Sequence, residues 1–232
     1  MVRCDWPRFG RHNDSVPPVA LFDLDNTLVD RAAAYRRWAE TFASGRGLGE
    51  DCVEWMCEAD NDGFRPRPEL FAAVVDQFGL KDDVGDLVGR YWTEYLSAYR
   101  PDPAVKDALR RLRDAGWRIG IVTNGPSTQH QKVERAELTD LVDACCVSDE
   151  VGSDKPDSRI FLEALRRCGH TGENGPRPWM VGDAPVPDIG GGIELGLWTV
   201  WIHRGRSWEL PDFRPQLEVT SVPEAVEIML TW

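Results

Sequence analysis

The sequence predicts an α/β fold in which a parallel β-sheet carries helices on both faces and a helical insert interrupts the chain. Three observations predict this class. Short apolar runs of strand length recur along the chain, stretches with apolar residues at helical spacing lie between the later runs, and residues 31–100 show helical spacing alone. Alternating strands and helices are typical of parallel sheets, because each parallel pair needs a crossover connection. With 232 residues and 42% hydrophobic content, the chain can form one domain, or a core domain with a smaller insert.

The first strand is expected at residues 19–23, an apolar run that ends in carboxylates and follows Pro17 and Pro18. Residues 1–18 are expected to form a flexible N-terminal extension. Residues 31–100 then carry four apolar stripes at helical spacing, which predict helices. The stripes are Tyr35, Trp38 and Phe42; Val53 and Met56; Leu70, Phe71, Val74, Val75 and Phe78; and Val84, Leu87, Val88, Tyr91, Trp92, Tyr95 and Tyr99.

After Pro101 the pattern changes to alternating helix and strand. Asp102 is expected to cap a helix that holds Pro103 in its first turn and ends at Gly116. The later elements follow from apolar runs and helical spacing. They are strands at residues 117–122, 144–147, 179–181 and 197–202, and helices at residues 158–168 and 189–195.

Polar side chains gather where the predicted strands end. Since a parallel sheet places its ligand site outside the carboxyl ends of its strands, four loops are expected to meet in one crevice. The side chains are Asp23, Asp25 and Thr27 after the first strand, Thr123 and Asn124 at the second, Lys155 after the third, and Asp183 and Asp188 after the fourth.

Two of these carboxylates have the chemistry that a phosphate monoester requires, namely a nucleophile and a proton donor for the leaving oxygen. Asp23 is the candidate nucleophile that would carry the phosphoryl group. Asp25 is the candidate general acid, and then the base that activates water. The candidate contacts for phosphate oxygens are the Thr123 hydroxyl, the backbone amides of Asn124 and Gly125 at a helix-opening turn, and the Lys155 ammonium.

The charges of this crevice predict a metal ion. Four carboxylates would face a single nearby cation, Lys155, before an anionic substrate arrives, so more positive charge is needed. A hard divalent ion with oxygen ligands provides it, and Mg²⁺ suits a site of few carboxylates, waters and a substrate phosphate. The candidate ligands are the side chains of Asp23 and Asp183 with the backbone carbonyl of Asp25, and Asp188 as a fourth candidate.

These residues form four motifs in order: FDLDNTL at residues 22–28, IVTNG at residues 121–125, Lys155 followed by Pro156, and VGD ending at Asp183 with Asp188 beyond. In them the chain resembles a haloacid dehalogenase superfamily hydrolase over nearly its whole length. The resemblance implies a Rossmann-like core at residues 19–30 and 101–232, and an Mg²⁺-assisted mechanism through an aspartyl-phosphate.

The resemblance also implies that residues 31–100 form the helical cap of that superfamily's first subclass, which closes over the site and selects substrates. One departure concerns Asp188. Pro187 precedes it where family members commonly have a small polar residue or Asn, so the loop is stiffer and lacks one hydrogen-bonding side chain. Asp188 can therefore be a metal ligand or a residue that orients its neighbours.

The function predicted is hydrolysis of a small phosphorylated metabolite, such as a sugar phosphate, a nucleotide or an organic acid phosphate. Two alternatives stay open, a phosphotransferase or mutase with the same intermediate and a non-enzymatic binding protein on this fold. Dehalogenation is disfavoured, because a halide leaves unprotonated and needs no second acid such as Asp25. The sequence leaves the oligomeric state open.

Composition excludes some classes of partner. A net charge of −12 and a pI near 4.8 argue against a nucleic-acid surface, and no apolar stretch is long enough for a membrane span or a signal segment. A cytoplasmic location is the expectation. The six cysteines lack metal-ligand spacing and are expected to be reduced thiols.

Several conspicuous residues have simpler explanations. Residues 60–63 resemble a calcium loop only superficially and are expected to form a turn, and the three glycines at 190–192 are expected to serve helix packing. Asp157, like Asp102, is expected to cap a helix. Arg65 and Arg67 could contact a substrate anion, and Trp38, Trp55 and Trp92 could line the insert's surface, but aromatic stripes at helical spacing usually form core.

Overall fold

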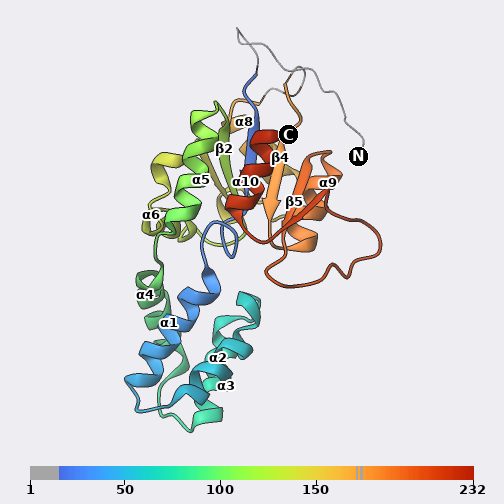
Figure 1. Cartoon of the computed structure of the whole chain (residues 1–232). Coiled ribbons are helices and arrows are strands. Elements are labelled where there is room, and N and C mark those ends of the chain that lie inside the picture. Colours follow the sequence, from blue (N-terminus) through green and yellow to red (C-terminus); the bar gives the residue numbers. More distant parts are fainter. Residues whose placement is uncertain (1–15, 171, 173–174) are drawn as a thin grey trace.

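The computed structural model describes residues 16–170, 172 and 175–232, and its centre is a six-stranded sheet (Figure 1). All strands are parallel, in the order β3-β2-β1-β4-β5-β6. The predicted α/β class and parallel sheet are confirmed. The strands are β1 (Val19–Phe22), β2 (Arg118–Thr123), β3 (Ala144–Val147), β4 (Trp179–Gly182), β5 (Trp198–Ile202) and β6 (Leu217–Val219).

Helices cover both faces of the sheet because alternate side chains of each strand point to opposite faces. Ala20 and Phe22 of β1 belong to a core cluster with apolar residues of α5 (Pro103–Asp114) and α10 (Val222–Thr231). Val19 and Leu21 belong to a second cluster with α8 (Ser158–Arg167). The shorter connecting elements are α6 (Gln129–Arg135), η3 (Thr139–Leu141), α7 (Ser148–Val151), η4 (Pro185–Gly190) and α9 (Gly191–Glu194).

The predicted helices of residues 31–100 form a group of their own beyond one end of the sheet (Figure 1). Their aromatic stripes pack together, as the T-shaped contact of Trp38 with Tyr91 at 5.0 Å between ring centroids shows. The core interpretation of the stripes is therefore confirmed for these residues. The elements are α1 (Arg31–Ser44), α2 (Glu50–Asp60), η1 (Asn61–Gly63), α3 (Arg67–Phe78), α4 (Val84–Glu94) and η2 (Tyr95–Ala98).

Three parts of the fold differ from the sequence analysis. The sequence analysis gave no element with bounds between residues 125 and 143 or at residues 148–151, where the structure has α6, η3 and α7. No element was predicted beyond residue 202, where the structure has β6 and α10. β6 is only three residues long and buries Val219 alone, too little for a recognisable pattern. The helix predicted at residues 189–195 is shorter, and a π-helical turn precedes it at η4.

Two smaller predictions are confirmed, those of the helix caps and of the glycine packing. Asp102 and Asp157 cap α5 and α8 through their side chains. Added Cβ atoms at Gly191 and Gly192 would lie 2.7 Å from Phe161 and Thr199, so these glycines serve close packing. Five cysteines are free thiols, and Cys4 lies outside the described residues with most of the predicted extension. Among the described helices, none is long and apolar enough to cross a membrane.

Candidate active site

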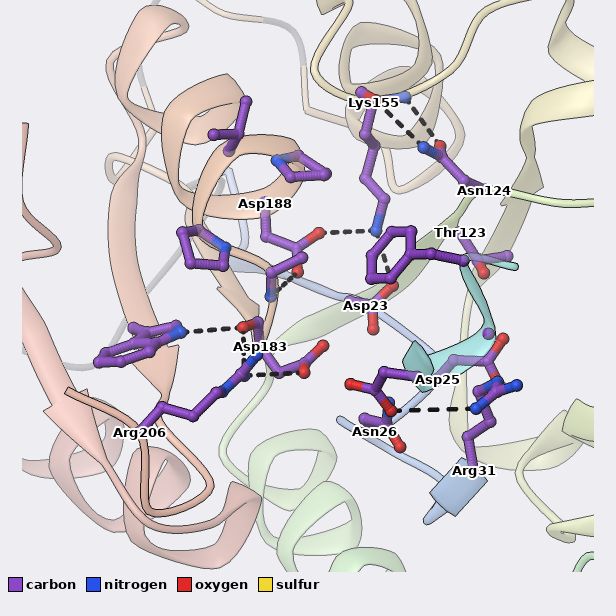
Figure 2. Close-up of a pocket in the computed structure, with 18 of the residues that line it drawn as sticks. Asp23, Asp25, Asn26, Arg31, Thr123, Asn124, Lys155, Asp183, Asp188 and Arg206 are labelled. Carbon is purple, nitrogen blue, oxygen red and sulfur yellow. Dashed lines mark hydrogen bonds and ion pairs between the residues drawn. The ribbon is translucent and has the colours of Figure 1, made fainter. Parts of the chain in front are cut away.

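A pocket of about 1020 Å³ opens at the carboxyl ends of the central strands (Figure 2). Every residue that the sequence analysis assigned to catalysis, phosphate binding or metal binding lines it. The eight residues are Asp23, Asp25, Thr123, Asn124, Gly125, Lys155, Asp183 and Asp188. The predicted convergence of four loops is therefore what the structure shows.

Asp23 owes its position to the strand before it. Its N–H donates to the carbonyl of Val181 at 2.9 Å, which continues the pairing of β1 with β4 by one residue beyond Phe22. Asn26 then turns the chain with a left-handed φ of 64°, which Asn tolerates better than most residues. The chain therefore leaves the sheet within a few residues, and both carboxylates of the DxD motif stay at the strand end.

Lys155 lies between two buried carboxylates. Its Nζ donates to Oδ1 of Asp23 at 2.6 Å and to Oδ1 of Asp188 at 2.7 Å (Figure 2). Asn124 positions this lysine through its side chain, which donates to the Lys155 carbonyl at 3.1 Å and accepts from the Lys155 N–H at 2.8 Å. Burial lowers the pKa of Lys155, but the two carboxylates outweigh it and keep the ammonium charged.

Three carboxylates lie close enough to hold one metal ion. Oxygens of Asp23, Asp183 and Asp188 are all within 4.8 Å of one another, and all three residues are buried. Burial raises the pKa of Asp183 to about 6, with a contribution from Asp23, and it also raises the pKa values of Asp23 and Asp188. Burial and, to a smaller extent, the neighbouring carboxylates therefore destabilise these anions, and a hard divalent ion with oxygen ligands, such as Mg²⁺, fits this donor set.

Asp188 already uses both of its oxygens. Oδ1 accepts from Lys155, and Oδ2 accepts from the Ala184 N–H at 2.9 Å. Gly182 makes room for this carboxylate, since an added Cβ there would lie 2.2 Å from Oδ2 of Asp188. These contacts favour the orienting role of the two roles considered for Asp188.

Asp25 lies in a different environment, which the sequence analysis missed. Lys132 donates to its Oδ2 at 2.6 Å, Gln129 donates to the same oxygen at 3.0 Å, and the Tyr99 hydroxyl donates to Oδ1 at 3.2 Å. Burial raises the pKa of Asp25, but the charge and hydrogen bond of Lys132 and the amide of Gln129 outweigh it, so the pKa lies below its ordinary value. Asp25 is ionised at neutral pH in this state.

The expectation of a single nearby cation was wrong. Besides Lys155, Lys132 pairs with Asp25, and Arg206 lies 2.9 Å and Arg204 3.4 Å from Oδ2 of Asp183. These cations come from α6 and from the segment after β5, and no motif marks them.

The contacts predicted for phosphate oxygens are only partly available. The Thr123 hydroxyl oxygen accepts a hydrogen bond from Gln129 at 2.6 Å, which leaves its proton free to donate. The Gly125 N–H already donates to Ser148 at 3.0 Å. The turn at Asn124 and Gly125 does not open a helix directly, because α6 begins at Gln129, after Gly125 at a φ of 140° and Pro126.

The turn predicted at residues 60–63 is confirmed, but its place at the pocket was missed. Asp62, Gly63 and Phe64 line the pocket from the helical side. Asp62 accepts from Nδ2 of Asn26 and from Nη1 of Arg204, both at 2.9 Å. The tip of the helical segment is therefore bonded to the sheet domain on two sides of the pocket.

Comparisons with known proteins agree with this geometry. The sequence model of the haloacid dehalogenase-like hydrolase family matches residues 18–196 of this chain. A glyceraldehyde 3-phosphate phosphatase from Pyrococcus furiosus is 33% identical over 224 residues, which cover 91% of this chain and 92% of that protein. A ribulose-1,5-bisphosphate 5-phosphatase from Halopiger xanaduensis is 39% identical over 203 residues, which cover 78% and 82%.

The fold has the same kind of relatives among solved structures. A putative haloacid dehalogenase-type hydrolase from Bacillus subtilis, in a form bound to magnesium, superposes with a TM-score of 0.71 at 22% identity. The match covers 92% of this chain and 98% of that protein. At 22% identity, this similarity is evidence for the fold alone.

Proposed function

The chain belongs to the haloacid dehalogenase-like hydrolase family and is a phosphoric monoester hydrolase, and on this premise we propose how it acts. A small phosphorylated metabolite is hydrolysed through a phosphoryl group carried by Asp23, with Mg²⁺ as the cofactor. The relatives from Pyrococcus furiosus and Halopiger xanaduensis are named as phosphatases of glyceraldehyde 3-phosphate and ribulose-1,5-bisphosphate, which supports a substrate of this size and charge.

One observation carries the proposal. Lys155 binds Oδ1 of Asp23 at 2.6 Å, while Oδ2 of Asp23 has no hydrogen bond from residues that the structure describes. The lysine thus fixes the carboxylate and leaves one oxygen for attack. A group that only capped a helix or solvated a loop would have no need of this buried arrangement.

The two steps follow from the positions of the DxD carboxylates. Oδ2 of Asp23 forms a bond to phosphorus while the bond from phosphorus to the leaving oxygen breaks, and protonated Asp25 gives that oxygen its proton. Asp25 then takes a proton from water, whose oxygen bonds to phosphorus and releases inorganic phosphate from Asp23. Lys132 keeps Asp25 ionised in the free protein, whereas a phosphoryl dianion beside Asp25 would raise its pKa.

The remaining pocket residues bind and orient. Lys155 offsets charge on the phosphoryl oxygens, and the Thr123 hydroxyl donates to one of them. Asp23, Asp183 and the backbone carbonyl of Asp25 would hold Mg²⁺, and Asp188 would hold Lys155. When bound, Mg²⁺ would polarise the phosphoryl group and offset its negative charge.

The helical segment completes the proposed site. We infer that residues 31–100 act as a cap over a core formed by residues 19–30 and 101–232. The bonds of Asp62 to Asn26 and Arg204 support this, because they join the tip of the segment to the core beside Asp23 and Asp183. Opening and closing of such a cap would admit the substrate and exclude water.

A phosphate-release assay tests the proposal. Para-nitrophenyl phosphate and a panel of sugar, nucleotide and organic acid phosphates are offered to the wild type and to Asp23→Asn, with Mg²⁺ and with EDTA. We expect release only by the wild type with Mg²⁺. Full activity of Asp23→Asn would refute the nucleophile, and phosphate that moves to an added alcohol instead of water would indicate a phosphotransferase.

A further inference from the structure

Arg31 holds a buried charge that its protein contacts do not satisfy. The side chain is 8% exposed, and its Nη2 donates to Oδ1 of Asp60 at 3.0 Å. Its Nη1 is buried without a hydrogen-bond partner in the part of the chain that the structure describes. An oxygen of Asp62 lies 3.9 Å away, beyond hydrogen-bond distance. Buried polar groups are nearly always bonded, so this donor points to a missing partner.

The surrounding charges leave a surplus of positive charge at Arg31. Asp60 is shared, because Nη1 of the equally buried Arg67 lies 2.5 Å from its Oδ1. One carboxylate therefore serves two buried guanidinium groups, and we call Arg31, Asp60 and Arg67 the tip cluster. Asp62 does not restore the balance, since it already accepts from Asn26 and from the guanidinium of Arg204.

Arg31 lies at the pocket that contains Asp23. In the view of Figure 2 it lies beside Asp25 and Asn26, on the side away from Lys155. Gly63 packs directly on the guanidinium, where an added Cβ would lie 2.6 Å from Cζ of Arg31. A pocket of about 1020 Å³ is far larger than a phosphoryl group, so it has room for the rest of a substrate between Asp23 and this arginine.

We propose that Arg31 binds a second anionic group of the substrate through Nη1, so that the preferred substrates are phosphate monoesters that also carry a carboxylate or a second phosphate. The inference rests on the proposed phosphatase function. A guanidinium suits both groups, because it presents several donors in one plane and stays charged when buried. In the present state an oxygen of Asp62 lies 3.9 Å from Nη1, and the incoming anion would take a position closer to this nitrogen.

Inhibition of para-nitrophenyl phosphate hydrolysis tests the inference on the wild type. This reporter has no second anionic group, so its hydrolysis reports the proposed function alone. Two matched pairs of inhibitors are compared. Glycolate 2-phosphate is paired with 2-hydroxyethyl phosphate, and propane-1,3-diol bisphosphate with 3-hydroxypropyl phosphate. The first pair tests a carboxylate and the second a phosphate.

In at least one pair, we expect the compound with the second anionic group to inhibit at concentrations about 10- to 100-fold lower than its hydroxyl partner. This factor is the range of a charged hydrogen bond. Equal inhibition within both pairs would overturn the inference while the reporter activity stands. Absence of reporter hydrolysis would instead refute the proposed function, and the inference with it.

Variants then assign the preference to Arg31. Arg31→Gln should abolish the preference for the inhibitor with the second anionic group. The inhibitory concentration of its hydroxyl partner should stay within about 3-fold of the wild-type value. Arg67→Gln is the matched control. Arg67 also pairs with Asp60, but it is not among the residues that line the pocket. The control should keep the preference. Loss of the preference in Arg67→Gln but not in Arg31→Gln would overturn the assignment, and the wild-type comparison decides the matter if Arg31→Gln does not fold.

Discussion

The strand-end crevice and the tip cluster hold buried charge in opposite proportions. In the crevice, Lys155 serves two carboxylates, those of Asp23 and Asp188, and Asp183 lies close by. In the tip cluster, Asp60 serves two guanidinium groups. Arg204 and Arg206, the other cations beside Asp183, are 27% and 41% exposed, so the first region is short of buried positive charge. The second is short of buried negative charge. One side of the pocket thus suits a divalent cation and the other suits an anion.

Between these regions lies a balanced pair. Asp25 and Lys132 are 2.6 Å apart and match one charge with one charge. This pair needs no further ion, which agrees with the proton transfer that we propose for Asp25. The contrast teaches that the ratio of buried acids to buried bases is more informative about ligands than the number of either.

The largest expected effect concerns the tip cluster. Asp60→Asn removes the carboxylate that two buried guanidinium groups share, so the free energy of unfolding should fall by about 3–5 kcal/mol. Urea unfolding measures it. Asp107→Asn is the control, because Asp107 pairs with Arg110 on an exposed helix surface and should cost less than about 1 kcal/mol. Equal losses in the two variants would contradict the buried charge surplus.

The next effect concerns pH and the crevice. Because burial raises the pKa of Asp183 from 3.8 to about 6, the folded state binds this proton more tightly than the unfolded state. Asp183 therefore stabilises the fold below about pH 4, and this contribution is lost as the pH rises through 6. In EDTA, the unfolding free energy of the wild type should fall relative to Asp183→Asn by about 3 kcal/mol between pH 4 and 7.

With Mg²⁺, the unfolding free energy of the wild type should no longer fall relative to Asp183→Asn as the pH rises, because a bound cation stabilises the ionised carboxylate. Urea unfolding of both proteins across this pH range, with Mg²⁺ and with EDTA, measures the difference. If the difference in unfolding free energy between wild type and variant in EDTA did not change with pH, Asp183 would not be destabilised as an anion.

A smaller effect is expected at the balanced pair. Asp25→Asn should lower kcat for an alkyl phosphate by about 100-fold, since an alkoxide needs a proton to leave. Para-nitrophenyl phosphate should lose less than about 10-fold, because its leaving group is stable as an anion. Steady-state kinetics with both substrates measures the ratio. Equal losses would argue against Asp25 as the acid.

The sequence predicted the crevice better than the tip cluster, and the reason is physical. Asp23, Lys155 and Asp183 follow buried strands, and the rule that parallel strands place ligand sites at their carboxyl ends brings such residues together without knowledge of side-chain packing. Five of the six strands could be placed for the same reason, since buried strands are apolar runs. β6 escaped because only one of its three residues is buried.

Arg31, Lys132 and Arg206 could not be found in this way. Arg31 and Arg206 line the pocket and Lys132 binds Asp25, each from a helix or a loop. Their positions depend on how distant segments pack, as with Arg31 and Asp60, which are 29 residues apart. Polar residues on helices are usually exposed, so their burial is visible only in the folded structure. For this reason the sequence underestimated the positive charge around the crevice.

Binding of Mg²⁺ to the metal-free protein, measured by isothermal titration calorimetry, tests most directly whether the surplus of carboxylates in the crevice holds a cation. The account predicts one bound ion per chain for the wild type, and an affinity at least about 10-fold lower for Asp183→Asn. Asp102→Asn makes the same chemical change at the cap of α5 and should bind as the wild type does. Binding by Asp183→Asn that equals the wild type would contradict the account.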